Sequence, residues 1–291
     1  MKKKTSFSTK GQRADIGDLT IYRMLANRYT DAVGPFVFLD HIAPKPQTSR
    51  HLRGTGAHPH RGIATLTYLI AGEATHFDSA GNHASVHSGG IQWMKAGNGI
   101  LHDETLTADS QADSDLTHGF QFWINLPAKY KAEKPEYLAI QSHEVPQKNL
   151  PNDGGWIKVI AGGYEELIAK IPSYSEQFLY HIQLEAGRDF TISFAESSEV
   201  AAFLPTTNVT LNDFEFETGE FIEFDRAAGE IVIDNPLQEP TDILLFGGEP
   251  YTEPIVAEGP FVMNSQAEIA DAYRDFYAGN YGEIDRQKGK V

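Results

Sequence analysis

Turn residues interrupt the apolar segments of this chain about every 8–12 residues, which favours many short strands over long helices. In residues 64–70, for example, Thr65 and Thr67 alternate with apolar neighbours, and Asp78-Ser79-Ala80-Gly81-Asn82 reads as a hairpin turn. The expected strands are 19–25, 33–41, 64–70, 91–94, 118–126, 177–184, 189–194, 200–204, 221–225, 231–234 and 243–246. Such a series is typical of an all-β sandwich or barrel.

Three segments of the chain differ from this pattern. Residues 5–20 read as a polar arm before the first strand, and residues 44–53 as a loop covering a site. Ser265 and Glu268 form a capping box, and Gly279 stands where a residue that ends a helix belongs. We therefore expect one short C-terminal helix at about 265–278.

The length of 291 residues favours two domains. The Lys-, Pro- and Gly-containing stretch 128–155 reads as the passage between them, so we expect domains at 1–150 and 151–291. No apolar segment approaches the ~20 residues that span a bilayer, and no secretory signal is recognisable. The absence of cysteine excludes disulfides and thiolate metal sites, and fits a reducing compartment. We expect a cytoplasmic protein with no membrane partner, nuclear localisation staying open for a eukaryotic source.

Charge is distributed unevenly along the chain. The net charge is −16, and residues 151–291 hold 8 Lys and Arg against 26 Asp and Glu, whereas residues 1–150 hold 16 against 14. Binding to phosphate backbones requires a basic face. The composition therefore argues against a direct nucleic-acid partner and favours an acidic, solvated surface.

Two pairs of potential metal ligands share a spacing of two residues. His58 and His60 follow a glycine turn, and His102 and Glu104 follow Gly97-Asn98-Gly99. Side chains two apart on a strand point to the same face, so two neighbouring strands would aim three imidazoles and a carboxylate at one point. Asp103 should point to the opposite face. A chance His-Pro-His turn beside a polar strand end is the alternative.

We predict one divalent transition metal per chain at these four residues. Imidazole and carboxylate ligands with open positions suit Fe(II), and also Zn, Ni, Mn or Cu. Ten of the 11 histidines lie in residues 1–150. His118 stays open as a residue that borders the site. We interpret the others as ordinary surface or core residues: His41, His51, His76, His83, His87, His143 and His181.

Several longer motifs resemble one known family. They are Val33-Gly34-Pro35-Phe36, Leu39-Asp40-His41, Gly56-Ala57-His58-Pro59-His60-Arg61-Gly62, Gln92-Trp93-Met94, Ala96-Gly97-Asn98-Gly99-Ile100, His102-Asp103-Glu104, Phe122-Trp123-Ile124-Asn125-Leu126-Pro127, Glu253-Pro254-Ile255 and Gly259-Pro260-Phe261-Val262-Met263-Asn264. Together they resemble the pirin family within the cupin superfamily, over nearly the whole chain. Two positions depart from the family pattern: Ala64 stands where many members have Glu, and Asp103 where many have Ser.

The resemblance implies an all-β fold of two cupin barrels (double-stranded β-helix or jelly-roll) face to face, with a short C-terminal helix. The first barrel would bind one iron through His58, His60, His102 and Glu104, and the second would have lost its ligands. Family members have quercetin 2,3-dioxygenase activity, and some eukaryotic ones are nuclear transcriptional co-regulators.

We accordingly expect a monomeric oxidoreductase that cleaves a flavonol-like aromatic substrate with O2 and uses Fe(II). Glu104 would be its catalytic base. The alternative is a non-catalytic regulator whose partners read the metal's redox state. An open cleft at the metal would favour the enzyme, and a capped site the regulator.

Overall fold

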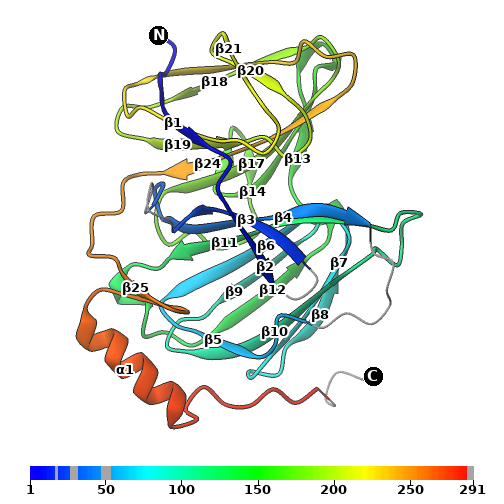
Figure 1. The fold of residues 1–291 in the computed structure, drawn as a ribbon. Coiled ribbons are helices and arrows are strands. Elements are labelled where there is room, and N and C mark those ends of the chain that lie inside the picture. Colours follow the sequence, from blue (N-terminus) through cyan, green and yellow to red (C-terminus); the bar gives the residue numbers. More distant parts are fainter. Residues whose placement is uncertain (17–18, 27–31, 47–53, 287–291) are drawn as a thin grey trace. The chain divides into compact units, whose positions relative to one another are not determined.

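The computed structural model describes residues 1–16, 19–26, 32–46 and 54–286, and it is almost entirely β-sheet (Figure 1). One α-helix, α1 (Gln266–Tyr277), stands near the C-terminus of the described chain. The prediction of an all-β fold with a short C-terminal helix is confirmed. No helix in the described ranges is long and apolar enough to cross a membrane.

The chain forms two compact units that are not consecutive in sequence. The first unit comprises Arg13–Arg23, Val37–Glu144 and Thr252–Val291, and the second comprises Met1–Gln12, Met24–Phe36 and Val145–Tyr251. This division differs from the expected split into 1–150 and 151–291. The expected arm at residues 5–20 begins with a strand of the second unit, because β1 (Thr5–Thr9) pairs with β22 (Phe221–Phe224). The C-terminal helix belongs to the first unit.

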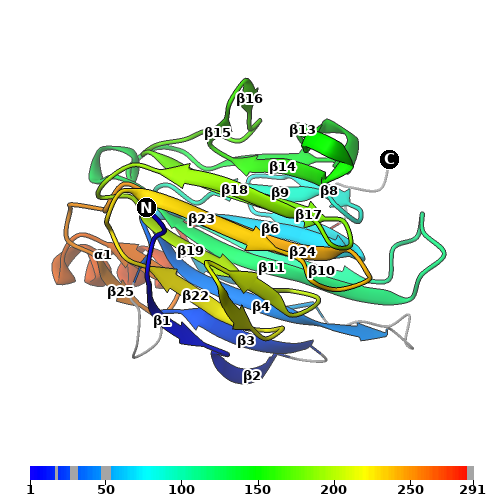
Figure 2. The ribbon, with the colours of Figure 1, turned by 90° about the horizontal axis from the view of Figure 1, so that it is seen from above.

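The first unit is a barrel built from two sheets. Its seven-stranded sheet has the order β12-β9-β6-β11-β4-β3-β2, and Figure 2 shows β11, β4 and β3 side by side. Its four-stranded sheet has the order β5-β10-β7-β8. The bounds are β2 (Gln12–Ile16), β3 (Leu19–Leu25), β4 (Phe36–Pro46), β5 (His58–His60), β6 (Ile63–Ala71), β7 (Glu73–Asp78), β8 (His83–Val86), β9 (Ile91–Lys95), β10 (Ile100–Thr107), β11 (Leu116–Asn125) and β12 (Glu136–Ile140). Of the expected loop 44–53, residues 44–46 belong to β4, and residues 47–53 lie outside the described ranges.

Apolar side chains from both sheets meet inside this barrel. Ile42 and Leu69 of the seven-stranded sheet pack with Ala74, Val86 and Leu106 of the four-stranded sheet. The burial pattern of β7 alternates along the strand, as expected where one face is inside and the other faces outward. One side of the four-stranded sheet is therefore turned into the barrel.

The second unit has the same two-sheet construction. Its sheets have the orders β1-β22-β19-β24-β17-β14-β13 and β18-β23-β20-β21, and β15 pairs with β16. The remaining bounds are β13 (Gln147–Asn149), β14 (Gly155–Ala161), β15 (Gly163–Tyr164), β16 (Leu167–Ile168), β17 (Gln177–Leu184), β18 (Asp189–Phe194), β19 (Glu199–Phe203), β20 (Val209–Leu211), β21 (Phe214–Phe216), β23 (Gly229–Asp234) and β24 (Thr241–Gly248). Phe190, Ile192 and Leu245 lie in its apolar core, and Phe194 packs against this core. Three 3-10 helices lie in the expected passage: η1 (Ala128–Tyr130), η2 (Ser142–Glu144) and η3 (Pro151–Asp153).

The helix begins and ends where the sequence predicts. Ser265 is the N-cap, its Oγ accepts from the backbone N–H of Glu268 at 3.3 Å, and the Glu268 carboxylate accepts from Asn264 N at 2.9 Å. Ile269 and Ala272 are the buried residues of this helix, and they pack in one cluster with Phe261 and Met263 of a hairpin. That hairpin is formed by β25 (Val256–Glu258) and β26 (Phe261–Met263).

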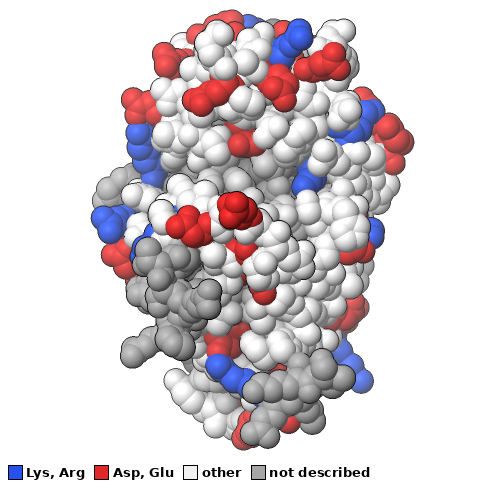
Figure 3. Space-filling view, turned by 90° about the vertical axis from the view of Figure 1, so that its right-hand side faces the viewer, with Lys and Arg blue, Asp and Glu red and all other residues white. Residues whose placement is uncertain are grey.

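Surface charge is mixed on the face drawn in Figure 3. Among the side chains coloured there, Asp and Glu are interspersed with Lys and Arg, and wide uncharged areas separate them. This face carries no continuous basic stripe of the kind that follows a phosphate backbone.

Candidate metal centre

Strand register brings the predicted residues onto one face of the four-stranded sheet. On β5 and β10, His58 pairs with His102, and His60 pairs with Ile100. On β10 and β7, Glu104 pairs with His76. Because side chains alternate along a strand, the histidines of β5 and β10 and the carboxylate of Glu104 all turn to the same side.

Three imidazoles meet at one point. One ring nitrogen of each of His58, His60 and His102 lies within 4.8 Å of the others. The closest pair is His58 Nε2 and His102 Nε2, at 3.0 Å. His60 and His102 are almost fully buried, with 2% and 1% of their surface exposed, and His58 is half-buried.

Hydrogen bonds to the backbone orient two of these rings. His58 Nδ1 donates to the carbonyl oxygen of Gly56 at 2.7 Å, and His60 Nδ1 donates to that of Pro260 at 3.1 Å. With the proton on Nδ1, each Nε2 presents a lone pair. Burial, and next the neighbouring His58, lower the pKa of His60 to about 3. Burial and the adjacent imidazoles also lower the pKa of His102. The imidazoles of His60 and His102 are therefore neutral at physiological pH, the state in which histidine binds metals.

A divalent transition metal fits this donor set. Two lone pairs 3.0 Å apart repel one another unless a proton or a cation lies between them. Two ligands bound at right angles to one metal, each ~2.1 Å from it, are ~3 Å apart. The separation of His58 Nε2 and His102 Nε2 therefore matches a pair of ligands on one ion.

Glu104 lies beside the three imidazoles and belongs to an adjoining set with His76 and His102. Its Oε1 is 3.8 Å from His76 Nδ1 and 3.9 Å from His102 Nδ1. It also accepts a hydrogen bond from Thr67 Oγ1 at 3.2 Å. Among the described residues, three of the four predicted ligands thus form one set, and Glu104 stands next to it.

His76 is the site residue that the sequence interpretation missed. It is fully buried, and its Nε2 donates to Asp78 Oδ2 at 3.1 Å, while the ring of Tyr137 stacks on it at 4.2 Å. Burial lowers the pKa of His76, but Asp78 and Glu104 outweigh burial and raise it. The signal was present, because His76 and Asp78 repeat the two-residue spacing of the predicted ligand pairs.

Other histidines in the described ranges lie outside this set, and His51 lies outside the described ranges. His118, which the sequence left open, faces His41, with their Nε2 atoms 2.9 Å apart. His87 forms a third set with Glu73 and Asp109, whose donor atoms lie within 4.8 Å of one another. In that set Asp109 accepts a hydrogen bond from His87 Nδ1 at 2.9 Å, and Glu73 accepts one from Ser110 Oγ at 2.5 Å. These hydrogen bonds explain why the three side chains lie together without a metal ion.

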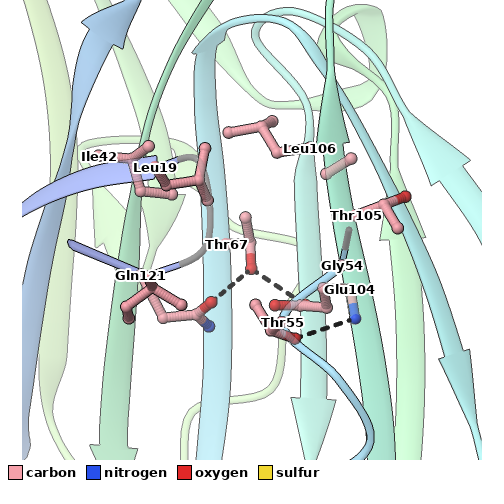
Figure 4. A pocket seen from close by; sticks show the side chains of 11 residues that line it. Leu19, Ile42, Gly54, Thr55, Thr67, Glu104, Thr105, Leu106 and Gln121 are labelled. Carbon is pink, nitrogen blue, oxygen red and sulfur yellow. Dashed lines mark hydrogen bonds between the residues drawn. The ribbon is translucent and has the colours of Figure 1, made fainter. Parts of the chain in front are cut away.

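A small cavity adjoins Glu104 inside the first unit. It has a volume of about 50 Å³. Figure 4 shows Thr67, Gln121 and Glu104 at its polar end and Leu19 and Ile42 at its apolar end. A cavity of this size holds a dioxygen molecule or one or two waters.

Comparison with protein families and curated proteins gives consistent matches. The sequence model of the family Pirin matches residues 19–124, and that of the Pirin C-terminal cupin domain matches residues 179–282. A provisionally named quercetin 2,3-dioxygenase of Pseudomonas aeruginosa is 31% identical over 286 residues, 97% of this chain and 99% of that protein. Another, from Vibrio cholerae, is 33% identical over 271 residues, 91% of this chain and 93% of that protein.

Solved structures show the same fold. A quercetin 2,3-dioxygenase from Acinetobacter baumannii is 31% identical and has a TM-score of 0.88, covering 98% of this chain and 100% of that chain. A bacterial pirin from Escherichia coli, solved in complex with nickel(II), is 20% identical with a TM-score of 0.63, covering 84% of this chain and 99% of that chain. The second likeness is one of fold alone.

Proposed function

The chain belongs to the pirin family, and on this premise we propose that it is a metal-dependent dioxygenase that opens the central ring of quercetin-like flavonols. The observation that supports this most is the set of three imidazoles at His58, His60 and His102, whose donor atoms lie within 4.8 Å of one another. The names of the relatives from P. aeruginosa and V. cholerae suggest the substrate class.

The proposed metal ligands are His58, His60 and His102, with Glu104 as a fourth, exchangeable ligand. Fe(II) is the proposed metal, and Zn, Ni, Mn and Cu are alternatives for the same donor set. When bound, the metal supplies a Lewis acid that favours the ionised 3-hydroxyl of the flavonol, and it supplies redox chemistry with O2.

The side chains around the carboxylate suit proton removal. Glu104 accepts the 3-hydroxyl proton of the flavonol on Oε1, and Thr67 Oγ1–H orients the carboxylate through the 3.2 Å hydrogen bond. The Glu104 side chain is only 12% exposed and its neighbours Thr67 and His76 are buried, so water competes weakly for the carboxylate. The overall reaction consumes one O2 per flavonol and releases one carbon monoxide as the ring opens, as the family resemblance implies.

The test is iron-loaded protein with quercetin under air. We expect the quercetin absorbance band to disappear with matched O2 consumption and carbon monoxide release. His60→Ala should abolish all three signals, and His143→Ala, at an exposed histidine on η2, should leave them unchanged. A wild-type protein that holds iron and leaves the quercetin band unchanged would refute the proposed activity.

One observation favours a second candidate function, a metal-dependent regulatory protein without catalysis. The cavity beside Glu104 measures about 50 Å³, whereas pockets for drug-sized ligands measure roughly 300–1,000 Å³. A flavonol requires more space than this cavity provides. Metal binding without quercetin turnover, together with metal-dependent binding of a partner protein, would favour this function.

A further inference from the structure

A second pocket lies at one end of the barrel in the second unit. It has a volume of about 740 Å³, within the range of roughly 300–1,000 Å³ that is typical of small-molecule sites. Both sheets contribute to its wall, because Gln177 begins β17 and Phe194 ends β18. Tyr164 is added by the β15–β16 hairpin, which projects from the sheets in Figure 2. All of its lining residues belong to the second unit.

Aromatic rings form one wall of this pocket. Phe178 stacks on Phe194 with ring centroids 5.1 Å apart, and on Tyr180 with centroids 5.2 Å apart. Tyr164 meets Tyr180 edge-on at 5.7 Å. Phe178, Phe194 and Tyr164 also pack against the apolar core, which holds their rings in place. Such ring faces attract flat apolar groups and cations, so the wall suits a ligand with an aromatic body.

The charged side chains of the pocket are all acidic. Glu165, Glu176 and Glu249 line it, and its described lining residues include no Lys, Arg or His. Lys148 pairs with Glu165, whereas neither Glu176 nor Glu249 forms an ion pair within the part of the chain that the structure describes. The pocket therefore disfavours an anionic ligand and favours a cation.

A buried amide lies next to these carboxylates. Gln177 pairs with Gly248 in the strand register, and the backbone N–H of Glu249 donates to the carbonyl oxygen of Glu176 at 3.3 Å. Gln177 is 8% exposed, and its Oε1 is buried without a hydrogen-bond partner in the described ranges. Buried polar groups are nearly always paired, so an unpaired acceptor at the wall of a pocket is suited to a donor on a ligand. The N–H groups of an ammonium ion are strong donors of this kind.

We propose that this pocket binds a small organic cation, a primary ammonium ion with an aromatic body. The ring of the ligand packs on the wall formed by Phe178 and Phe194. Its ammonium group donates to Gln177 and is attracted by Glu176 and Glu249. No residue of the metal centre lines the pocket, so this binding site goes beyond the proposed function.

Calorimetric titration of the full chain with phenethylamine tests the proposal. We expect one phenethylamine per chain, and at least about 10-fold weaker binding of 2-phenylethanol and 3-phenylpropionate, which carry a neutral and an anionic group instead. Gln177→Leu should weaken phenethylamine binding by about 10-fold or more, because a hydrogen bond to a charged group is lost. Glu176→Gln and Glu249→Gln should each weaken it by about 2–5-fold, and by less at high salt.

The matched charge control is Glu239→Gln. Glu239 is exposed and precedes β24, at the opposite end of that strand from Gly248, so this variant should keep the wild-type affinity. His60→Ala should bind phenethylamine as the wild type does. The binding result therefore stands apart from the outcome of the quercetin assay.

The cysteine-free sequence allows the position of the ligand to be checked. Ala195→Cys places a thiol at the pocket, and Ala186→Cys places one in the turn between β17 and β18, at the other end of both strands. Both alanines are exposed. Phenethylamine should slow maleimide labelling of the first thiol and leave labelling of the second unchanged.

Three results would overturn the proposal. They are a wild-type protein that does not bind phenethylamine, equally tight binding of 2-phenylethanol, and undiminished binding in the Gln177 and glutamate variants. If Gln177→Leu fails to fold, the two exposed glutamate variants and the labelling of Ala195→Cys decide the question. Full affinity in both glutamate variants, without protection of that thiol, would place the ligand elsewhere and overturn the proposal as well.

Discussion

Arg286 donates a hydrogen bond to Oδ2 of Asp103, the residue that separates His102 from Glu104 on β10. The Asp103 side chain is 3% exposed and that of Arg286 is 60% exposed. Side chains alternate along a strand, so Asp103 turns away from the imidazoles while both of its neighbours turn toward them. The guanidinium of Arg286, near the end of the described chain, thus neutralises the buried carboxylate of Asp103 on the outer face of β10. The arrangement fits the prediction that Asp103 faces away from the site.

Arg286→Gln should lower the free energy of unfolding by about 1–2 kcal/mol. Breaking a fully buried pair costs ~3–5 kcal/mol, and the exposure of Arg286 to solvent reduces that figure. Urea unfolding of apo protein at low and high salt measures the difference, which should shrink with added salt.

Asp103→Asn supplies the control for this pair. It removes the buried charge, so Arg286→Gln made in that background should cost little, and the two changes should be strongly non-additive. An equal cost of Arg286→Gln in both backgrounds would show that the guanidinium acts through other contacts, such as its position 5.8 Å from the ring of Phe77.

His60→Ala should remove the metal. The variant deletes a buried ligand whose Nδ1 is held by Pro260 O, and losses of this kind weaken sites by ~10–100-fold or more. Elemental analysis should find one metal per wild-type chain and almost none in the variant, with His143→Ala matching wild type. A variant that keeps its full metal content would show that the metal binds elsewhere.

Local turn signals predicted much of the fold. The bounds of β3, β17 and β18 agree with the sequence prediction, and Gly187, with a φ of 66°, lies in the turn between β17 and β18. β1 lies in the segment that we expected to be a polar arm. Its partner β22 is more than 200 residues away in the sequence, so no local pattern indicates that this segment is a strand. The membership of helix α1 in the first unit is also a long-range property.

The candidate site was predictable to a similar degree. The two-residue spacing and the strand register suffice to bring His58, His60 and His102 together. Glu104 accepts a hydrogen bond from Thr67 on β6, a contact between strands that the two-residue spacing does not indicate. His76 was read as an ordinary residue, because its relation to Glu104 arises only when β7 pairs with β10.

Glu104→Gln should slow quercetin turnover by ~10²–10⁴-fold if removal of the 3-hydroxyl proton limits the rate. The amide keeps the size of the side chain and can still accept from Thr67, but it is a far weaker base. Metal content has to be measured on the same sample, because a lost ligand would imitate a lost base. Full turnover at full metal content would mean that another group takes the proton.

Asp109→Asn should remove a pH-dependent part of the stability. Burial alone would raise the pKa of Asp109, but hydrogen bonds from Ser88 Oγ at 2.6 Å, Ser88 N at 3.0 Å and Gln111 N at 2.9 Å outweigh it and lower the pKa to about 2. A carboxyl that ionises more readily in the folded state stabilises the protein above its unfolded pKa of 3.8, and this contribution is lost as the pH falls toward 2. It amounts to about 1–2 kcal/mol at pH 7, allowing for solvent near the surface. Urea unfolding of both proteins should give a constant difference from about pH 7 to pH 5, which is about halved by pH 3. A difference that stays the same down to pH 3 would assign the loss to the missing hydrogen bonds and not to the charge.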